Sequence, residues 1–278
     1  MRALAAFAVL SLLLASAGIA WAEPSLSAPD TGLVDVPTAY VAVDHSIAAA
    51  YQDLEGDADA APVRLLLAIG GNAELGAGWA RLSGFGTTDE ALSLAGKYQL
   101  VRETAVGPAV ALGVRWAKLD LDARQFPMIP SSISGWYEAT STQAYLAVSK
   151  TLPTAASDLG VPEMAGHLGI AWHQVDQEYR ITEGTVTTRG GDDSDGLEGF
   201  AALEAHSRQG TVLAVEYRSK PSNFITDPIV SVLARHQFNN EVTGEIGWTN
   251  AAPAGSVGLE DHHVFVGLSY SFRAKGAR

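Results

Sequence analysis

The most constraining feature of this sequence is a period-two alternation of side chains that recurs along most of the chain. Near the C-terminus, for example, Val264, Val266 and Leu268 alternate with Gly267 and Ser269. Successive side chains of a β-strand point to opposite faces, so this pattern indicates strands with one apolar face. After the N-terminal leader, no stretch reaches the roughly 18 consecutive apolar residues that a transmembrane helix needs.

About twelve segments share the pattern, and each has the length of roughly 8–11 residues that a tilted strand needs to cross a membrane. Their second faces carry Gly, Ala, Ser, Thr and an occasional Glu or His, which suits a partly polar lumen better than a soluble core. We therefore predict an all-β fold, an antiparallel transmembrane β-barrel of about 12 strands (range about 10–14). The predicted strands are residues 46–54, 61–69, 74–82, 92–100, 106–116, 140–150, 167–175, 196–206, 211–218, 228–238, 241–250 and 263–272.

The connections between these segments mostly alternate between long and short. Transmembrane barrels have short periplasmic turns and longer outer loops, and a β-sandwich has no reason to alternate in this way. This alternation of long and short connections predicts that both termini are periplasmic. The exception is 151–166, which should be short and is not. The long connections are near residues 55–61, 83–90, 119–139, 176–195, 219–228 and 251–260.

The N-terminus has the features of a secretory signal peptide. Arg2 is followed by an apolar run over residues 4–14, and Ala20-Trp21-Ala22 is an A-x-A cleavage site. We expect residues 1–22 to be a signal peptide that is cleaved near Ala22, residues 23–44 to be a periplasmic segment that leads into the barrel, residues 45–272 to form the barrel, and residues 273–278 to be a short periplasmic tail. The absence of cysteine fits export to an oxidising compartment.

The C-terminal strand carries a second export signal, because its alternation ends on Phe272. Strands of this kind are typical of outer-membrane barrels and are recognised by the barrel-assembly machinery. We therefore expect that machinery, outer-membrane lipids and lipopolysaccharide as partners, in the outer membrane of a Gram-negative cell. A net charge of −13 argues against nucleic acid, since phosphate binding needs clustered Lys and Arg.

Three short motifs carry a family resemblance. Residues 31–39 read T-G-L-V-D-V-P-T-A, residues 149–152 read S-K-T-L, and residues 214–217 read A-V-E-Y. In this order they resemble the YjbH-like outer-membrane proteins, of which this chain matches a single barrel module. The resemblance implies an outer-membrane barrel associated with exopolysaccharide production or export. It marks as motif residues Gly32, Leu33, Pro37, Thr38 and Ala39. Pro37 fits either a functional turn at the barrel mouth or a plain turn before the first strand.

Charged residues on the faces opposite the apolar sets are expected to point into the lumen. Side chains of both signs could form a mixed-charge plug or line a narrow pore, since a barrel of about twelve strands has room for either. Ion pairing for structure is the default interpretation, and we expect no catalytic residue and no cofactor. The candidates for the lumen are Glu204, Glu216, Glu241, Glu245, Arg64, Arg81, Arg115 and Arg235.

Asp192, Asp193 and Asp195 crowd hard oxygen ligands together and resemble half of a calcium loop, although an acidic solvated loop is the simpler interpretation. Two further alternatives stay open. An outer-membrane lipid or lipopolysaccharide hydrolase would pair Ser269 or Ser271 with a histidine from another strand, and a soluble periplasmic β-sandwich would bind a ligand. The histidines considered for the hydrolase are His173, His236 and His263.

Overall fold

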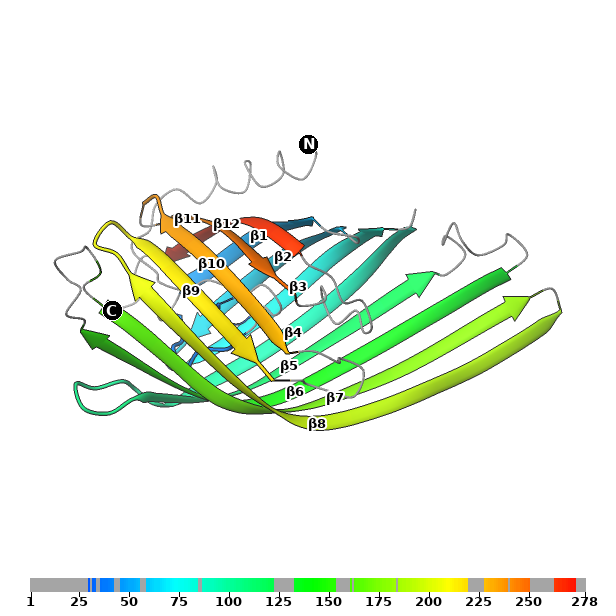
Figure 1. The fold of residues 1–278 in the computed structure, drawn as a ribbon, viewed down its shortest axis with the longest axis horizontal. Helices are drawn as coiled ribbons and strands as arrows, with labels where there is room; N and C mark the ends of the chain where they lie inside the picture. Colours follow the sequence, from blue (N-terminus) through cyan, green and yellow to red (C-terminus); the bar gives the residue numbers. More distant parts are fainter. Residues whose placement is uncertain are drawn as a thin grey trace.

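The protein folds as a closed antiparallel barrel of twelve strands (Figure 1). The computed structural model describes residues 30, 32–33, 36–42, 46–55, 59–84, 87–122, 133–153, 161, 163–183, 185–219, 228–239, 241–250 and 263–273. Every strand pairs with its neighbours in the chain, and the first strand closes the ring by pairing with the last. Within the described residues, no helix is long and apolar enough to cross a membrane.

The twelve strands follow one another with no other regular element among the described residues. Each of them overlaps one of the twelve segments expected from the alternation, so the predicted all-β antiparallel barrel of about 12 strands is confirmed. The strands are β1 (Ser46–Glu55), β2 (Asp59–Ile69), β3 (Ala73–Gly84), β4 (Thr87–Val101), β5 (Ala109–Asp122), β6 (Ile133–Pro153), β7 (Glu163–Glu183), β8 (Val186–His206), β9 (Thr211–Arg218), β10 (Ile229–Gln237), β11 (Val242–Thr249) and β12 (His263–Arg273).

The strands β6, β7 and β8 are the longest, at 21 residues each, and they sweep past the rest of the sheet in Figure 1. The connection expected over residues 176–195 is therefore almost entirely strand, and so is most of 83–90. Polar residues continue the ladder here because antiparallel pairing satisfies the main-chain N–H and C=O groups whether or not the side chains are apolar.

The two faces of the sheet differ in composition, as the alternation predicts. The outer face exposes large apolar side chains, which suits contact with lipid hydrocarbon rather than water. The inner face is buried and carries small and polar residues. A sandwich would cover its apolar face with a second sheet, so the closed ring excludes that alternative. Exposed apolar residues include Leu65, Leu67, Leu75, Trp79, Leu92, Leu94, Leu112, Val114, Ile170, Trp172, Val215, Val232, Ile246, Val264 and Val266.

Aromatic side chains fill the interior by lying over glycines of the neighbouring strand. Tyr145 of β6 pairs directly with Gly113 of β5, and a Cβ atom added at Gly113 would collide with the Tyr145 ring. Phe265 lies over Gly247 in the same way. Glycine is therefore required at Gly113 by a close approach, and it fixes the ring of Tyr145 where it meets the contents of the lumen.

Candidate functional site: a chain segment inside the barrel

The lumen holds the part of the chain that precedes β1. We call residues 30, 32–33 and 36–42 the N-terminal segment. Leu33, Val36 and Ala39 are 3%, 0% and 0% exposed and belong to one apolar cluster with alanines and aromatic residues of the inner wall. We expected residues 23–44 to form a periplasmic approach to the barrel, and the described part of that range lies inside it instead. The small wall residues leave the room that the segment fills.

The segment reverses direction in a tight turn. Gly32 and Pro37 form an isolated antiparallel bridge, and the N–H of Leu33 donates to the carbonyl oxygen of Val36 at 3.1 Å. Pro37 has no N–H and therefore leaves no unsatisfied donor at its buried position. The residues of the family-like motif thus form this turn and the stretch after it, within the lumen.

Side chains of the barrel wall accept hydrogen bonds from main-chain N–H groups of the segment. The N–H of Val36 donates to Glu216 Oε2 on β9 at 3.2 Å, and the N–H of Ala42 donates to Glu74 Oε2 on β3 at 3.0 Å. A third N–H, that of Ala39, donates to Ser149 Oγ on β6 at 2.7 Å. Buried main-chain donors are costly when unpaired, so these wall side chains make the burial of the segment possible.

Other wall side chains donate to the carbonyl groups of the segment. Lys97 Nζ of β4 donates to the carbonyl oxygen of Thr38 at 3.2 Å, and Gln99 Nε2 of the same strand donates to that of Ala39 at 2.8 Å. Lys97 also forms an ion pair with Glu74 at 2.9 Å, with both side chains fully buried. The wall therefore forms hydrogen bonds with both the N–H and the C=O groups of the segment's main chain.

Asp30 anchors the deep end of the segment and is itself fully buried. Its carboxylate accepts from Arg115 of β5, with Nη2 at 2.9 Å and Nε at 3.0 Å, and from the hydroxyl of Tyr145. Burial alone would raise the pKa of this carboxyl, but the Arg115 guanidinium, and Lys97 beyond it, outweigh burial and hold the pKa below its usual value. Asp30 is therefore anchored by a bidentate, charge-assisted contact with Arg115.

Tyr40 fixes the other end of the segment near the rim. Its hydroxyl donates to Glu103 Oε2 at 2.6 Å and lies 2.7 Å from Thr151 Oγ1, and its ring meets that of His167 edge-on at 5.8 Å. Burial and the bond to Glu103 raise the pKa of the Tyr40 hydroxyl above its ordinary value. The pKa of Glu103 is lowered: burial opposes this, but the bonds from Tyr40, the Thr151 N–H and Lys150 prevail.

A buried polar chain lies directly behind the segment. Ser149 Oγ is 2.7 Å from His167 Nδ1, and His167 Nε2 is 2.8 Å from Glu204 Oε1. The second oxygen of Glu204 lies 2.8 Å from His206 Nε2. These residues come from the adjacent strands β6, β7 and β8, and Ser149 and His167 are direct cross-strand partners.

Comparisons with known proteins agree with this geometry at the level of the fold. No protein-family model matches the chain, and no curated protein matches its sequence. Among solved structures, the translocator domain of the autotransporter NalP from Neisseria meningitidis superposes with a TM-score of 0.51 and 15% identity, over 81% of this chain and 87% of that one. The KdgM porin in complex with disordered oligogalacturonate superposes with a TM-score of 0.50 and 11% identity, over 81% and 99%. The fold is that of an outer-membrane β-barrel.

The structure places most of the residues expected in the lumen of this barrel on its inner face. Arg64, Arg115, Glu204 and Glu216 are buried there. Arg235 Nη2 lies 3.1 Å from Glu245 Oε2 across β10 and β11, so these two residues pair with each other.

Two residues expected in the lumen are placed differently. Arg81 continues the outward parity of Leu75 and Trp79 on β3 and is exposed, so it faces away from the lumen. The alternation of this strand already implied that position. Glu241 lies in the turn before β11 and accepts from the hydroxyl of Tyr270 at 2.8 Å, so it lies at the rim.

The acidic residues considered for a metal lie in the strand β8 and not in a loop. Asp192, Asp193 and Asp195 are exposed, and Asp192 faces the opposite side from the other two because strand side chains alternate. Nowhere in the part of the chain that the structure describes do three or more His, Asp or Glu side chains gather as metal ligands.

The residues considered for a hydrolase are also spread over the inner face. Ser141 Oγ lies 2.7 Å from His173 Nε2, and Thr211 Oγ1 lies 2.9 Å from His236 Nδ1. Ser269, Ser271 and His263 are buried on β12. Sequence reasoning missed Ser149, which contacts His167, a histidine that in turn contacts the carboxylate of Glu204. The inward parity of residues 149, 167 and 204 on neighbouring strands was a signal that could have found it.

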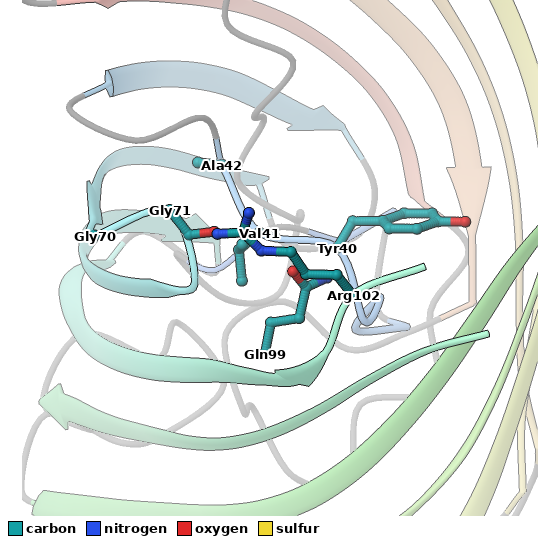
Figure 2. Close-up of a pocket in the computed structure, with 7 residues that line it drawn as sticks. All are labelled: Tyr40, Val41, Ala42, Gly70, Gly71, Gln99 and Arg102. Atoms are coloured by element: carbon teal, nitrogen blue, oxygen red, sulfur yellow. The ribbon is translucent and has the colours of Figure 1, made fainter. Parts of the chain in front are cut away.

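A pocket of about 510 Å³ opens at the rim beside the segment (Figure 2). Figure 2 shows Val41 beside the Gly70–Gly71 turn, with the Tyr40 ring directed away from that turn. The wall of the pocket is thus partly the segment itself, so anything bound here contacts the residues that hold the segment in place. The lining residues are Tyr40, Val41, Ala42, Gly70, Gly71, Gln99 and Arg102.

Proposed function

We propose that the protein is an outer-membrane channel that its own N-terminal segment closes. The observation that carries this proposal is the set of wall side chains that bind the main chain of the segment, among them Glu74, Lys97, Gln99, Ser149 and Glu216. Any buried segment needs partners for its main-chain N–H and C=O groups, and here side chains of the wall supply several of them. A wall that satisfies both N–H and C=O groups holds one conformation of the segment, and such a conformation can be released as a unit.

The test uses a disulfide that locks the segment. Ser149 Oγ lies 2.7 Å from the N atom of Ala39, so the two residues are in direct contact and we place the pair of cysteines there. The chain has no cysteine of its own, so the A39C/S149C variant contains only this pair of thiols. In planar lipid bilayers we expect the oxidised variant to stay closed, and the same protein after reduction to show openings.

The matched controls are the two single cysteine variants, in which oxidation should change nothing. Equal conductance of the oxidised and reduced double variant, with the disulfide verified by mass spectrometry, would contradict closure by the segment. Heat-modifiable migration on a cold gel verifies that each variant retains a folded barrel.

For the solute we propose polysaccharide. The support is the YjbH-like motif order, whose first part is the segment that fills the lumen. The KdgM porin, a barrel of the same fold, is known in complex with oligogalacturonate. Vesicles that contain the reduced A39C/S149C variant should admit short oligosaccharides faster than vesicles with the oxidised form. Equal rates for sugars and salts of similar size would argue for a general pore.

A further inference from the structure

We propose that Ser149, His167 and Glu204 form a nucleophilic acyl-transfer site that the N-terminal segment covers, and that the site acts on a carboxylic ester when the segment leaves. Ser149 Oγ lies 2.7 Å from His167 Nδ1, and His167 Nε2 lies 2.8 Å from Glu204 Oε1. This is the arrangement of a nucleophile, a general base and a carboxylate that orients the base. The serine contacts Nδ1 and the carboxylate contacts Nε2, which is the reverse of the more common assignment.

Holding the segment does not explain this chain of residues. Ser149 needs only its oxygen to accept the Ala39 N–H at 2.7 Å. A buried carboxylate behind a histidine costs desolvation free energy, and a serine alone would serve as the acceptor without that cost. The protein keeps Glu204 at 8% exposure and supports it from a second side with His206 at 2.8 Å. Glu204, held in this way, orients His167 towards Ser149.

The segment covers both reacting groups. The Ala39 N–H occupies a lone pair of Ser149 Oγ, and the Tyr40 ring lies edge-on to His167 at 5.8 Å. An oxygen that accepts this N–H lies in the direction of the N–H bond and not above the carbonyl carbon of Thr38, so the peptide bond shields the serine and is not attacked. The segment therefore acts as a cap in this conformation.

Lys97 Nζ and Gln99 Nε2 also hold the segment over Ser149, because they bind the carbonyl oxygens of Thr38 and Ala39. In the trans peptide unit between these two residues the carbonyl oxygen points away from the N–H that caps Ser149, so Lys97 grips the segment from the side opposite the serine. The rim pocket of about 510 Å³, lined in part by Gln99 and Tyr40, lies beside the capping segment and has the size of a small-molecule site.

The chemistry balances without a cofactor. Ser149 Oγ forms a bond to the ester carbonyl carbon while its proton passes to His167 Nδ1. The bond from that carbon to the alcohol oxygen then breaks, and the alcohol takes the proton from His167. Water hydrolyses the acyl-serine through the same relay and releases a carboxylic acid. Glu204 stays ionised and stabilises the imidazolium, so Glu204 is a positioning residue.

The first measurement is labelling of the full folded chain in detergent with a fluorophosphonate, in which the Ser149 oxygen displaces fluoride from phosphorus. The D30N variant removes the charge of the anchor, and A39P removes the N–H over Ser149. We expect slow labelling of the wild type, labelling of both variants that peptide mass spectrometry locates at Ser149, and no labelling when S149A is added. H167Q should lower the rate about 100-fold and abolish its rise with pH, which a structural role would not do.

The matched control is S141A, since Ser141 also contacts a lumen histidine on the same two strands. It should leave the labelling unchanged. The proposal rests on the proposed closure only because the segment must leave before an ester can reach Ser149. Bilayer conductance measures that closure separately. A D30N or A39P chain that conducts but takes up no label overturns the ester site, and so does labelling that H167Q leaves intact. If D30N stays closed, closure is contradicted, while A39P still tests the serine.

Two sources of ester remain, and turnover separates them. Acetylated oligosaccharides and phospholipid micelles are offered to the A39P variant. Release of acetate alone assigns an O-acyl sugar, and release of fatty acid alone assigns a lipid ester. Release of neither, from protein that the fluorophosphonate labels, overturns the ester as the substrate class.

Discussion

At the scale of single residues, Asp30 decides whether the lumen is filled. Its carboxylate is fully buried and is satisfied by Arg115 and Tyr145. Removing one partner of a buried ion pair is costly because the other charge stays buried without compensation, typically by about 3–5 kcal/mol. Local release of the segment relieves that cost without unfolding the sheet, so the effect should appear in the conductance and not in the stability of the barrel.

The first prediction concerns D30N and pH. The pKa of Asp30 in the folded protein lies below its ordinary value of 3.8, so the stabilisation is fully present above about pH 4 and is lost as the pH falls through the lowered value. We expect wild-type conductance to stay low from neutral pH down to about pH 4 and then to rise. D30N should conduct across the whole range. Conductance traces at stepped pH measure both, and a closed D30N channel at neutral pH would contradict the role of the anchor.

Sequence reasoning was weakest for the contents of the lumen. The motif around Pro37 was visible, but nothing in the alternation of residues 46–273 states what lies between the strands, because lumen contents depend on contacts such as that of Val36 with Glu216, 180 positions apart. Parity did predict the inward placement of Arg64, Arg115, Glu204 and Glu216. Parity also predicts that Arg81 points outward, although its charge led to the expectation that it lies in the lumen.

At the scale of the elements, strand positions were predictable because each face meets one kind of environment. Strand lengths were not, since β7 and β8 continue through polar sequence over residues 176–195. Hydrophobic alternation reports only the part of a strand that lies against lipid. Beyond that part, main-chain pairing alone sustains the ladder, and many polar sequences allow it.

The second prediction tests the pairing of β5 with β6 through Gly113. A larger side chain at this position collides with the Tyr145 ring that lies over it. We expect G113V to displace Tyr145, to weaken its bond to Asp30 and to open the channel as D30N does. The matched variant is Y145F, which keeps the ring in place and removes only the hydroxyl, so it should open the channel through loss of the bond to Asp30 without the collision at Gly113. Bilayer conductance and heat-modifiable migration measure the two effects.

At the scale of the whole molecule, the barrel presents a band of apolar side chains on its outer surface, and charged residues such as Arg64 and Glu216 are buried inside. The third prediction uses two outward positions on the same pair of strands. Ile170 on β7 lies between Leu168 and Trp172 in the apolar band, while Thr187 shares the outward parity of Leu197 on β8 and lies at the hairpin end. I170R should lower the free energy of unfolding by about 2–4 kcal/mol in lipid, and T187R by about 0–1 kcal/mol. Urea titration in vesicles measures both, and equal losses would contradict the placement of the membrane at Ile170.

The closing pair of strands also constrains the order in which the molecule can be made. The segment before β1 touches β3, β4, β5, β6 and β9, and the ring shuts only when β1 meets β12, the last strand to be synthesised. A segment that precedes every strand must therefore wait until the chain has been made as far as β9 before these partners exist. The finished sheet thus encloses a part of the chain that was made before it, and the segment can take up its position only when strands as distant as β9 are present.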